Sequence, residues 1–587
     1  MTDSQQNTWK LIENYFETHS IVEDQISSFN HFLLYGIQEV IDNELPIITE
    51  TSDYNKYEIK FGNVYVSNPT LNGKTPLYPR VARITDLNYS GTILCNIIET
   101  LYDPTGAIIK QQMYNRVKIA EIPIMLKSCR CNLYKFGKND IINQGECLQD
   151  PGGYFIIKGN ERVLVSQIRN NYNQIIIQKC QKDNLSYIAK MRSMSEQTSH
   201  SVSILFRMNN ENNTIDITIP YVSNSFPLGI LFKAYGYKNE DIRQLLSLGT
   251  SESDTYIENI IRESYLIKNS EDALNHISKL CKNILDSNRK IEYAKQIIFQ
   301  ELFPHLGILS STKQKVLLLA MIAKKLISTH LGHRVIDNKD DIKFKRIETC
   351  GTLCKELFKT LFKKFLNIIK TNISKKKIYF DINNIISKIK VITVGMKYSF
   401  STGNWGAQKN SYVRLGVSQV MSRMNYHSTI SHMKRINIPI GKESKNKLIR
   451  QIHPSQLGYI CPSETPEGAS SGIVLNFSIF TRVTNQIPTF LVISIIKNNL
   501  KYTTVDDVDL NQLKTMTAIY LNGILIGFVQ CEDEFITKFK LLRRREYIDK
   551  NISISYNPID DEICIFSDAG RVNRPLFRVD EYPSEST

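Results

Sequence analysis

Residues 403–475, GNWGAQKNSYVRLGVSQVMSRMNYHSTISHMKRINIPIGKESKNKLIRQIHPSQLGYICPSETPEGASSGIVL, form the most informative stretch of the chain. Between residues 403 and 450, nine basic residues stand against one acid, Glu443, which gives nine minus one, or +8, of a total formal charge of +15. Charge of one sign is interleaved here with Gly, Pro, Asn, Ser and Tyr, a composition that favours shaped loops over one long helix. Loops that hold Arg and Lys beside Gln, Asn and His suit a phosphate backbone that follows a defined path.

Length and composition narrow the class of protein. At 587 residues the chain is too long for one hydrophobic core, so we expect three or more domains. Its 42% hydrophobic and 22% charged residues are typical of a globular protein. The longest clean apolar run, residues 316–323, is too short to span a bilayer, and the N-terminus lacks the pattern of a signal peptide. We therefore expect no membrane partner and no secretion.

The excess of positive charge indicates the kind of partner, and the spacing of the cysteines indicates whether a zinc site is expected. A basic chain fits a polyanionic partner, although lysine enrichment in an AT-rich genome would give the same balance; the clustering in 403–450 favours nucleic acid. The eleven cysteines are scattered. The close pairs Cys129/Cys131 and Cys350/Cys354 have no matching second pair and no nearby histidines, so we expect reduced thiols and no zinc site.

Several long motifs occur in a fixed order: GNWGAQK (403–409), GVSQV (416–420), STISHMKR (428–435), IPIG (438–441), RQIHPSQLGYICPSETPEG (450–468) and DAGRVNRPLF (568–577). Together they resemble the second-largest (β-like) subunit of multisubunit DNA-dependent RNA polymerase, of the RNA polymerase II type that large DNA viruses also carry. The resemblance runs from near Trp9 to about Phe577 and covers the N-terminal half of such a subunit. It implies a multidomain α+β fold of mixed helices and antiparallel sheets.

The resemblance also implies an order of domains. These are the protrusion with N-terminal helices (1–180), the lobe (181–345), the second part of the protrusion (346–402), the fork (403–480), external 1 (481–550) and the start of external 2 (551–587).

Local patterns predict individual elements. Helical spacing of apolar residues predicts helices within 9–41, and short Val/Ile/Tyr/Thr runs predict strands over 57–116. The turn residues of 147–167 predict a β-hairpin. A helix is predicted over 352–370, with apolar residues every four positions. Its basic stripe, Lys355, Lys359 and Lys363, is interpreted as a solvated face, with a phosphate-facing or partner-facing surface as the alternative.

The chemistry of the resembled enzyme is nucleotidyl transfer between two Mg²⁺ ions. No Asp-x-Asp-x-Asp triad occurs, and 505–509 (VDDVD) has the wrong spacing. The resemblance places the metal-binding carboxylates on the largest subunit. We therefore expect no catalytic residue, no Mg²⁺ ligand and no zinc site in this half, and no activity of the chain alone.

The resemblance assigns positions in the fork to nucleic acid. Residues 404–409 resemble fork loop 1 beside the RNA–DNA hybrid, and 439–447 resemble fork loop 2 near the separating downstream strands. An amide such as that of Gln419 can bond RNA phosphate or sugar, and Glu467 approaches the hybrid or the incoming nucleotide as an orienting group or Arg partner. The expected contacts to nucleic acid or hybrid are Gln408, Lys409, Gln419, Lys434, Arg435, Lys442, Arg450, Gln451, His453 and Glu467.

Four positions have two interpretations each. Trp405 is a packed loop anchor or a base-stacking platform. Arg423 forms an internal ion pair or meets nucleic acid. Residues 543–545 (three arginines) form a surface loop or a second nucleic-acid contact. His305 is a capping or packing residue or a ligand.

The expected function is that of the N-terminal half of a polymerase subunit, which positions template DNA, hybrid and NTP. Its partners would be the largest subunit, a separate C-terminal half of the second-largest subunit, other polymerase subunits, template DNA and nascent RNA. It would act in the nucleus, or in host cytoplasm or virion if viral. The alternative is a stand-alone basic nucleic-acid-binding protein from a split or decayed subunit. An independent hydrolase has no motif support.

Overall fold

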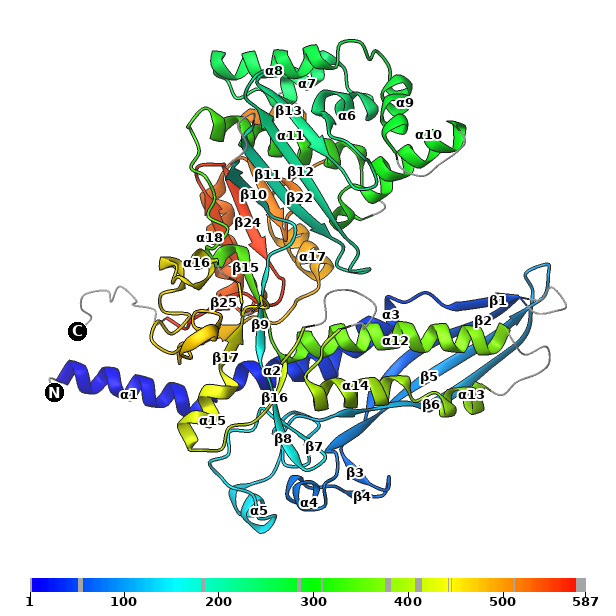
Figure 1. Ribbon diagram of the computed structural model, residues 1–587, viewed down its shortest axis with the longest axis vertical. Coiled ribbons are helices and arrows are strands. Elements are labelled where there is room, and N and C mark those ends of the chain that lie inside the picture. The colour runs from blue at the N-terminus through cyan, green and yellow to red at the C-terminus, as the bar shows by residue number, and fades with distance from the viewer. Residues whose placement is uncertain are drawn as a thin grey trace. The chain divides into compact units, whose positions relative to one another are not determined.

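The computed structural model describes residues 3–50, 56–180, 185–281, 287–307, 310–374, 382–406, 414–441, 443–444, 446–509 and 512–576 (Figure 1). Helices and antiparallel sheets alternate along it, which confirms the predicted α+β class. The chain divides into two compact units: residues 1–169, 345–485 and 569–587 form the first, and residues 170–344 and 486–568 form the second. Among the residues described, no helix is long and apolar enough to cross a bilayer.

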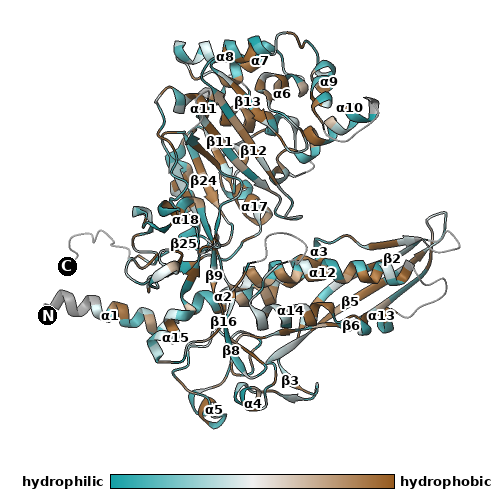
Figure 2. Cartoon of the chain, in the orientation of Figure 1, coloured by the Kyte–Doolittle hydropathy of each residue, from teal (hydrophilic) through white to brown (hydrophobic). Residues whose placement is uncertain are grey.

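The first unit is built around an antiparallel sheet of order β1-β2-β5-β6, which confirms the predicted strands of 57–116. The long helix α12 packs on it, with Phe61 of β2 against Phe362 and Phe365. Figure 2 shows hydrophobic and hydrophilic residues alternating along α12, and the predicted four-residue spacing lies in the core: Leu353, Leu357, Leu361 and Phe365 are all buried.

The predicted hairpin of 147–167 is also confirmed. Its strands β7 and β8 are joined at Lys158 and Gly159, whose φ angles of 49° and 75° lie in the left-handed region. A Cβ on Gly159 would lie 2.4 Å from Asp86 Oδ1, so only glycine fits this turn. Two strands of the segment predicted as the fork pair with this region: one pairs with β8, and the other pairs with β9, the next strand in the chain.

The second unit contains two sheets of five strands, β10-β11-β12-β13-β14 and β20-β22-β21-β24-β23. One hydrophobic cluster joins residues of 177–327 to residues of 505–528. The predicted lobe and the predicted external 1 region therefore share a core.

The elements of the first unit are α1 (Asp3–Thr18), α2 (Glu23–His31), a π-helix (Phe32–Gly36), α3 (Ile37–Asp42), β1 (Ile47–Glu50), β2 (Lys56–Val66), β3 (Thr70–Leu71), β4 (Thr75–Pro76), α4 (Pro79–Ile84), β5 (Ser90–Tyr102), β6 (Ile108–Pro123), α5 (Lys138–Asn143), β7 (Phe155–Ile157), β8 (Asn160–Leu164), β9 (Ser166–Asn170), β15 (Lys345–Glu348), α12 (Cys350–Ser374), α13 (Ile382–Lys388), α14 (Val391–Thr402), β16 (Ser418–Val420), α15 (Tyr426–Met433), β17 (Arg435–Asn437), α16 (Lys447–Arg450), β18 (Val474–Asn476), β19 (Arg482–Val483) and β25 (Val572–Asn573). Those of the second unit are β10 (Ile175–Lys179), β11 (Leu185–Met194), β12 (Ser201–Asn209), β13 (Thr214–Thr218), β14 (Phe226–Pro227), α6 (Leu228–Ala234), α7 (Asn239–Leu246), α8 (Ser251–Glu263), α9 (Ser270–Leu280), α10 (Ser287–Gln296), α11 (Thr312–His330), α17 (Thr489–Asn499), β20 (Thr503–Thr504), β21 (Thr517–Leu521), β22 (Ile524–Val529), α18 (Glu532–Arg544), β23 (Ser553–Asn557) and β24 (Glu562–Phe566).

Candidate nucleic-acid interface

Two short strands of the predicted fork are held by the hairpin region. Strand β16 pairs antiparallel with β8, with Gln419 opposite Val163. Strand β17 pairs parallel with β9 and antiparallel with β18, with Arg435 opposite Asn476. Segments more than 250 residues apart in sequence therefore form one frame, and Gln419 and Arg435 lie on it.

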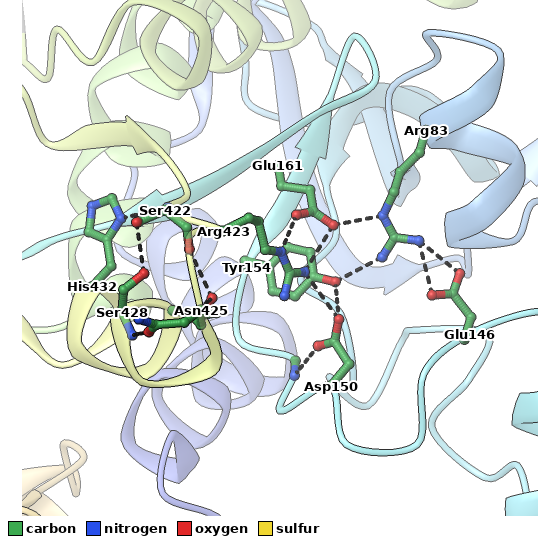
Figure 3. A network of polar contacts seen from close by, with 12 residues as sticks. Arg83, Glu146, Asp150, Tyr154, Glu161, Ser422, Arg423, Asn425, Ser428 and His432 are labelled. Atoms are coloured by element: carbon green, nitrogen blue, oxygen red, sulfur yellow. Dashed lines mark hydrogen bonds and ion pairs between the residues drawn. The ribbon is translucent and has the colours of Figure 1, made fainter.

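An ion-pair network fastens the same frame (Figure 3). Glu161 accepts from Arg83 Nε at 2.8 Å and from Arg423 Nε at 2.7 Å. Arg423 also donates to Asp150, and its guanidinium lies 5.1 Å from the centroid of the Tyr154 ring. Burial, followed by the charge of Asp150, raises the pKa of Tyr154, so its hydroxyl stays protonated and donates to Asp150 at 2.6 Å. Of the two interpretations of Arg423, the internal ion pair is confirmed.

Trp405 anchors the start of the predicted first fork loop. Its indole N–H donates to the Leu353 carbonyl at 2.8 Å, and its ring packs edge-on against Phe400 at 5.2 Å. The side chain is buried, which confirms the loop-anchor interpretation over a stacking platform. Gln408, Lys409 and Lys442 lie outside the described residues, so their predicted contacts stay predictions.

Gln419 is oriented by a buried histidine. His432 Nε2 lies 3.0 Å from Gln419 Oε1, and the Gln419 amide nitrogen donates to the Gly416 carbonyl at 3.0 Å. Burial, followed by the charge of Arg435, lowers the pKa of His432 to about 4, so the imidazole is neutral at physiological pH. The neutral ring thus contacts Gln419 directly, and Arg435 acts on it through its charge.

The adjacent basic residues Lys434 and Arg435 differ in environment. Lys434 is buried, and its ammonium donates to the carbonyls of Ser478 and Ile479 at 3.3 and 3.0 Å. Burial lowers its pKa to about 8, against the opposing effect of Asp24. Its ammonium is therefore occupied within the fold. Arg435 is partly exposed, so part of its side chain is open to solvent, whereas its buried Nε has no hydrogen-bond partner among the described residues.

Arg450 links two loops that come after β17 through hydrogen bonds to their carbonyls. Its Nη1 donates to the carbonyls of Ala469 and Ser471, both at 2.8 Å, and its Nη2 donates to Ser444 at 3.2 Å. A single guanidinium thus ties residues 444–450 to the loop of the PSETPEG motif. This is a structural role that sequence reasoning did not assign to Arg450.

The other predicted contacts after Arg450 lie at the surface. Gln451 is exposed, and His453 is partly exposed with its Nδ1 beside Ser455 Oγ at 2.7 Å. Glu464 accepts from the hydroxyl of Ser431, whereas Glu467 is exposed. The structure therefore places Gln451, His453 and Glu467 where an external ligand can reach them.

The basic stripe of α12 is solvated only in part. Lys355 pairs with Glu39 at 2.7 Å and Lys363 with Glu44 at 3.4 Å. Burial lowers the pKa of Lys359, which lies between them. The stripe is therefore solvated at Lys363 and partly covered at Lys355 and Lys359, because Glu39 of α3 and Glu44, just after α3, lie against it. Helical periodicity alone gives no sign of that contact.

His305 and the run of three arginines belong to the second unit. His305 is buried, with Nδ1 2.6 Å from Ser193 Oγ, which confirms its packing role. Residues 543–545 lie at the end of α18 rather than in a loop; Arg543 donates to the Ile552 carbonyl at 3.0 Å, and Arg544 and Arg545 are exposed.

Sequence reasoning missed two groups. His432 lies inside the STISHMKR motif, and the motif was the available signal. The bridge from Arg83 to Glu161 joins residues 78 apart, and no local pattern marks it. In the described parts of the chain, no three His, Cys, Asp or Glu side chains gather as metal ligands would.

Comparison with known proteins agrees with this architecture. Residues 20–393 match the family "RNA polymerase beta subunit", residues 419–483 match "RNA polymerase Rpb2, domain 3", and residues 519–580 match "RNA polymerase Rpb2, domain 4". The chain belongs to this family of second-largest RNA polymerase subunits. The resemblance drawn from the motifs is thereby confirmed.

Individual relatives are similar over almost the whole chain. A probable DNA-directed RNA polymerase II subunit RPB2 homolog of Invertebrate iridescent virus 6 is 33% identical over 98% of this chain and 54% of its own length. The DNA-directed RNA polymerase II subunit RPB2 of Encephalitozoon cuniculi is 33% identical, over 98% of this chain and 52% of its own. The DNA-directed RNA polymerase II subunit 2 of Arabidopsis thaliana is 31% identical, over 98% and 51%. The chain spans about half the length of the curated relatives it matches.

Proposed function

We propose that this chain works as the N-terminal half of the second-largest subunit of a DNA-dependent RNA polymerase, where it positions template DNA, the RNA–DNA hybrid and NTP. Family membership gives the class of enzyme. The observation that carries the nucleic-acid role is the placement of Gln419 and Arg435 on two anchored strands, with Gln419 held by the neutral imidazole of His432. A similarity that covers 98% of the chain does not favour a decayed, stand-alone binding protein.

In this proposal the residues of the chain act by orientation and charge. The guanidinium of Arg435 and the amide of Gln419 donate to phosphate or ribose oxygens, and Gln451, His453, Glu467 and the two fork loops complete the track. Donors fixed on strands lose little conformational freedom when the nucleic acid binds, which is how positioning contributes to rate. The two Mg²⁺ ions, with their carboxylate ligands, belong to the largest subunit and supply the charge stabilisation of phosphoryl transfer.

The proposed function includes partners, a role for each domain and a site of action. The partners are the largest subunit, a polypeptide that carries the remaining half of the second-largest subunit, other polymerase subunits, template DNA and nascent RNA. Residues 1–180 and 346–402 act as the protrusion, 181–345 as the lobe, 403–480 as the fork, and 481–587 as the external regions. The site of action is the nucleus, or host cytoplasm or virion for a viral polymerase.

Affinity purification of the tagged chain from its native source tests assembly. We expect a largest-subunit polypeptide to co-purify, together with transcription activity that depends on added Mg²⁺. Isolation of the chain without any other polymerase polypeptide would overturn the proposal.

Substitution in the purified enzyme tests the contact itself. Arg435→Ala should slow elongation about tenfold, since one charge-assisted hydrogen bond to phosphate is worth roughly 1.5 kcal/mol. Arg262→Ala removes an exposed arginine from the last turn of α8 and is the matched control. Equal elongation rates in Arg435→Ala and wild type would remove Arg435 from the proposed interface.

A further inference from the structure

Both ring nitrogens of His432 are engaged, and their partners settle which one carries the proton. The backbone N–H of Ser422 points at Nδ1 from 3.1 Å, so Nδ1 accepts. A neutral imidazole has one donor and one acceptor, so Nε2 carries the hydrogen. Nε2 then donates to the Gln419 carboxamide oxygen at 3.0 Å.

The loop before α15 fixes the Ser422 N–H in place (Figure 3). The Thr429 hydroxyl donates to the Ser422 carbonyl at 2.8 Å, and the hydroxyls of Ser422 and Ser428 are 2.9 Å apart. Asn425 caps α15 by accepting from the Ser428 N–H at 2.7 Å. The imidazole therefore meets a rigid donor at Nδ1, and the proton on Nε2 is imposed by the fold.

That proton sets the direction of the Gln419 side chain. Its oxygen is taken by His432, and its nitrogen gives one hydrogen to the Gly416 carbonyl. The carboxamide has two N–H donors, so one remains, and Gln419 is partly exposed. A flipped carboxamide would place N–H against the N–H of His432 and would lose both contacts.

We propose that His432 is a positioning residue, which holds the Gln419 carboxamide with its remaining N–H facing outward, so that the fork offers a donor to a phosphate or ribose oxygen of the hybrid. His432 does not itself contact nucleic acid: it is buried within the frame. The inference rests on the proposed function, and it deepens that function by naming the polarity of the contact.

The tautomer can be measured without any activity. Nitrogen NMR of the chain labelled at histidine, with His432 assigned by its absence in His432→Gln, should show the proton on Nε2 at neutral pH. A proton on Nδ1 would overturn the inference, because His432 would then accept from Gln419 and reverse the carboxamide.

Paired variants of the assembled polymerase test the positioning role. His432→Leu removes the donor, and we expect it to weaken hybrid binding about fivefold, the value of one hydrogen bond. Gln419→Ala should cost about the same, and the double variant no more than either one, since His432 acts only through Gln419. His432→Gln keeps an N–H near the position of Nε2 and should restore much of the affinity.

The outcomes separate the two claims. Losses that add in the double variant, or His432→Gln as weak as His432→Leu, would overturn the positioning role while the proposed function stands. Failure of the wild-type enzyme to bind hybrid would overturn the proposed function. If His432→Leu fails to fold, as judged by its thermal transition, the NMR measurement of the tautomer and the hybrid affinity of His432→Gln still test the positioning role.

Discussion

Arg423 and Glu161 are 262 residues apart in the sequence, and the arginine Nε lies 2.7 Å from the carboxylate. The same carboxylate accepts from Arg83 at 2.8 Å. One glutamate of the β7–β8 hairpin thus holds two cations, one from α4 and one from the predicted fork. The hairpin therefore holds the segment between β16 and α15 through this carboxylate and also pairs with β16.

Glu161→Ala should lower the free energy of unfolding by about 2–4 kcal/mol, since it leaves two arginines without their shared partner. The contribution of Arg423 is reduced because its side chain is 42% exposed. Glu121→Ala, which breaks the exposed Lys118–Glu121 pair, is the control and should cost less than about 1 kcal/mol. Urea unfolding of both variants measures the difference, and equal shifts would contradict the network.

Lys434 makes stability depend on pH. Burial lowers its pKa from the ordinary 10.5 to about 8, so between these values the unfolded chain binds more protons than the folded chain. Stability therefore rises with pH in this window. The advantage of wild type over Lys434→Met should grow from pH 8 to pH 10, by up to about 1.4 kcal/mol per pH unit. Urea midpoints at three pH values measure it, with Lys447→Met, at an exposed position, as control. A difference that stays flat with pH would mean that the ammonium is not buried.

Arg450 should behave as a loop clamp. Arg450→Ala releases three carbonyls, those of Ser444, Ala469 and Ser471, and should speed proteolysis within 439–475 without moving the main unfolding transition. Arg450→Lys should restore little, since one ammonium cannot present several N–H donors in a plane as a guanidinium does. Lys447→Ala, three residues earlier on α16, is the control. Cleavage at the wild-type rate in Arg450→Ala would show that the clamp is dispensable.

Much of the fold could be predicted from the sequence where a short stretch of residues determines the element. The hairpin followed from its turn residues, and the buried face of α12 from apolar residues every four positions. Ordered motifs gave the family.

The candidate site was harder to predict from the sequence, because the presence of a basic residue does not indicate whether its side chain is buried or exposed. Lys434 and Arg435 are neighbours in one motif, yet one ammonium is buried against carbonyls and the other group is partly exposed. Two of the α12 lysines, Lys355 and Lys363, pair with Glu39 and Glu44, more than 300 residues earlier in the sequence. Such contacts are set by tertiary packing, which local propensity does not contain.

Lys325 and Glu562 form a buried pair in the second unit, 2.6 Å apart, with Asp560 3.7 Å from the same ammonium. Lys325→Met leaves a buried carboxylate without its partner and should cost about 3–5 kcal/mol. The double variant Lys325→Met/Glu562→Leu should recover most of that loss, because an apolar pair of similar size needs no ionic compensation. Single and double variants compared by urea unfolding measure the recovery.

The loss in Lys325→Met should also depend on pH. Burial raises the pKa of Glu562 even with Lys325 present, and removal of the lysine takes away the largest influence that lowers it. A carboxyl whose pKa is raised on folding stabilises below its unfolded pKa and loses that stability as pH rises through the folded value. The deficit of Lys325→Met should therefore be smaller at pH 5 than at pH 8, and the double variant should show no such trend. A deficit that is equal at both pH values would mean that Glu562 is solvated rather than buried.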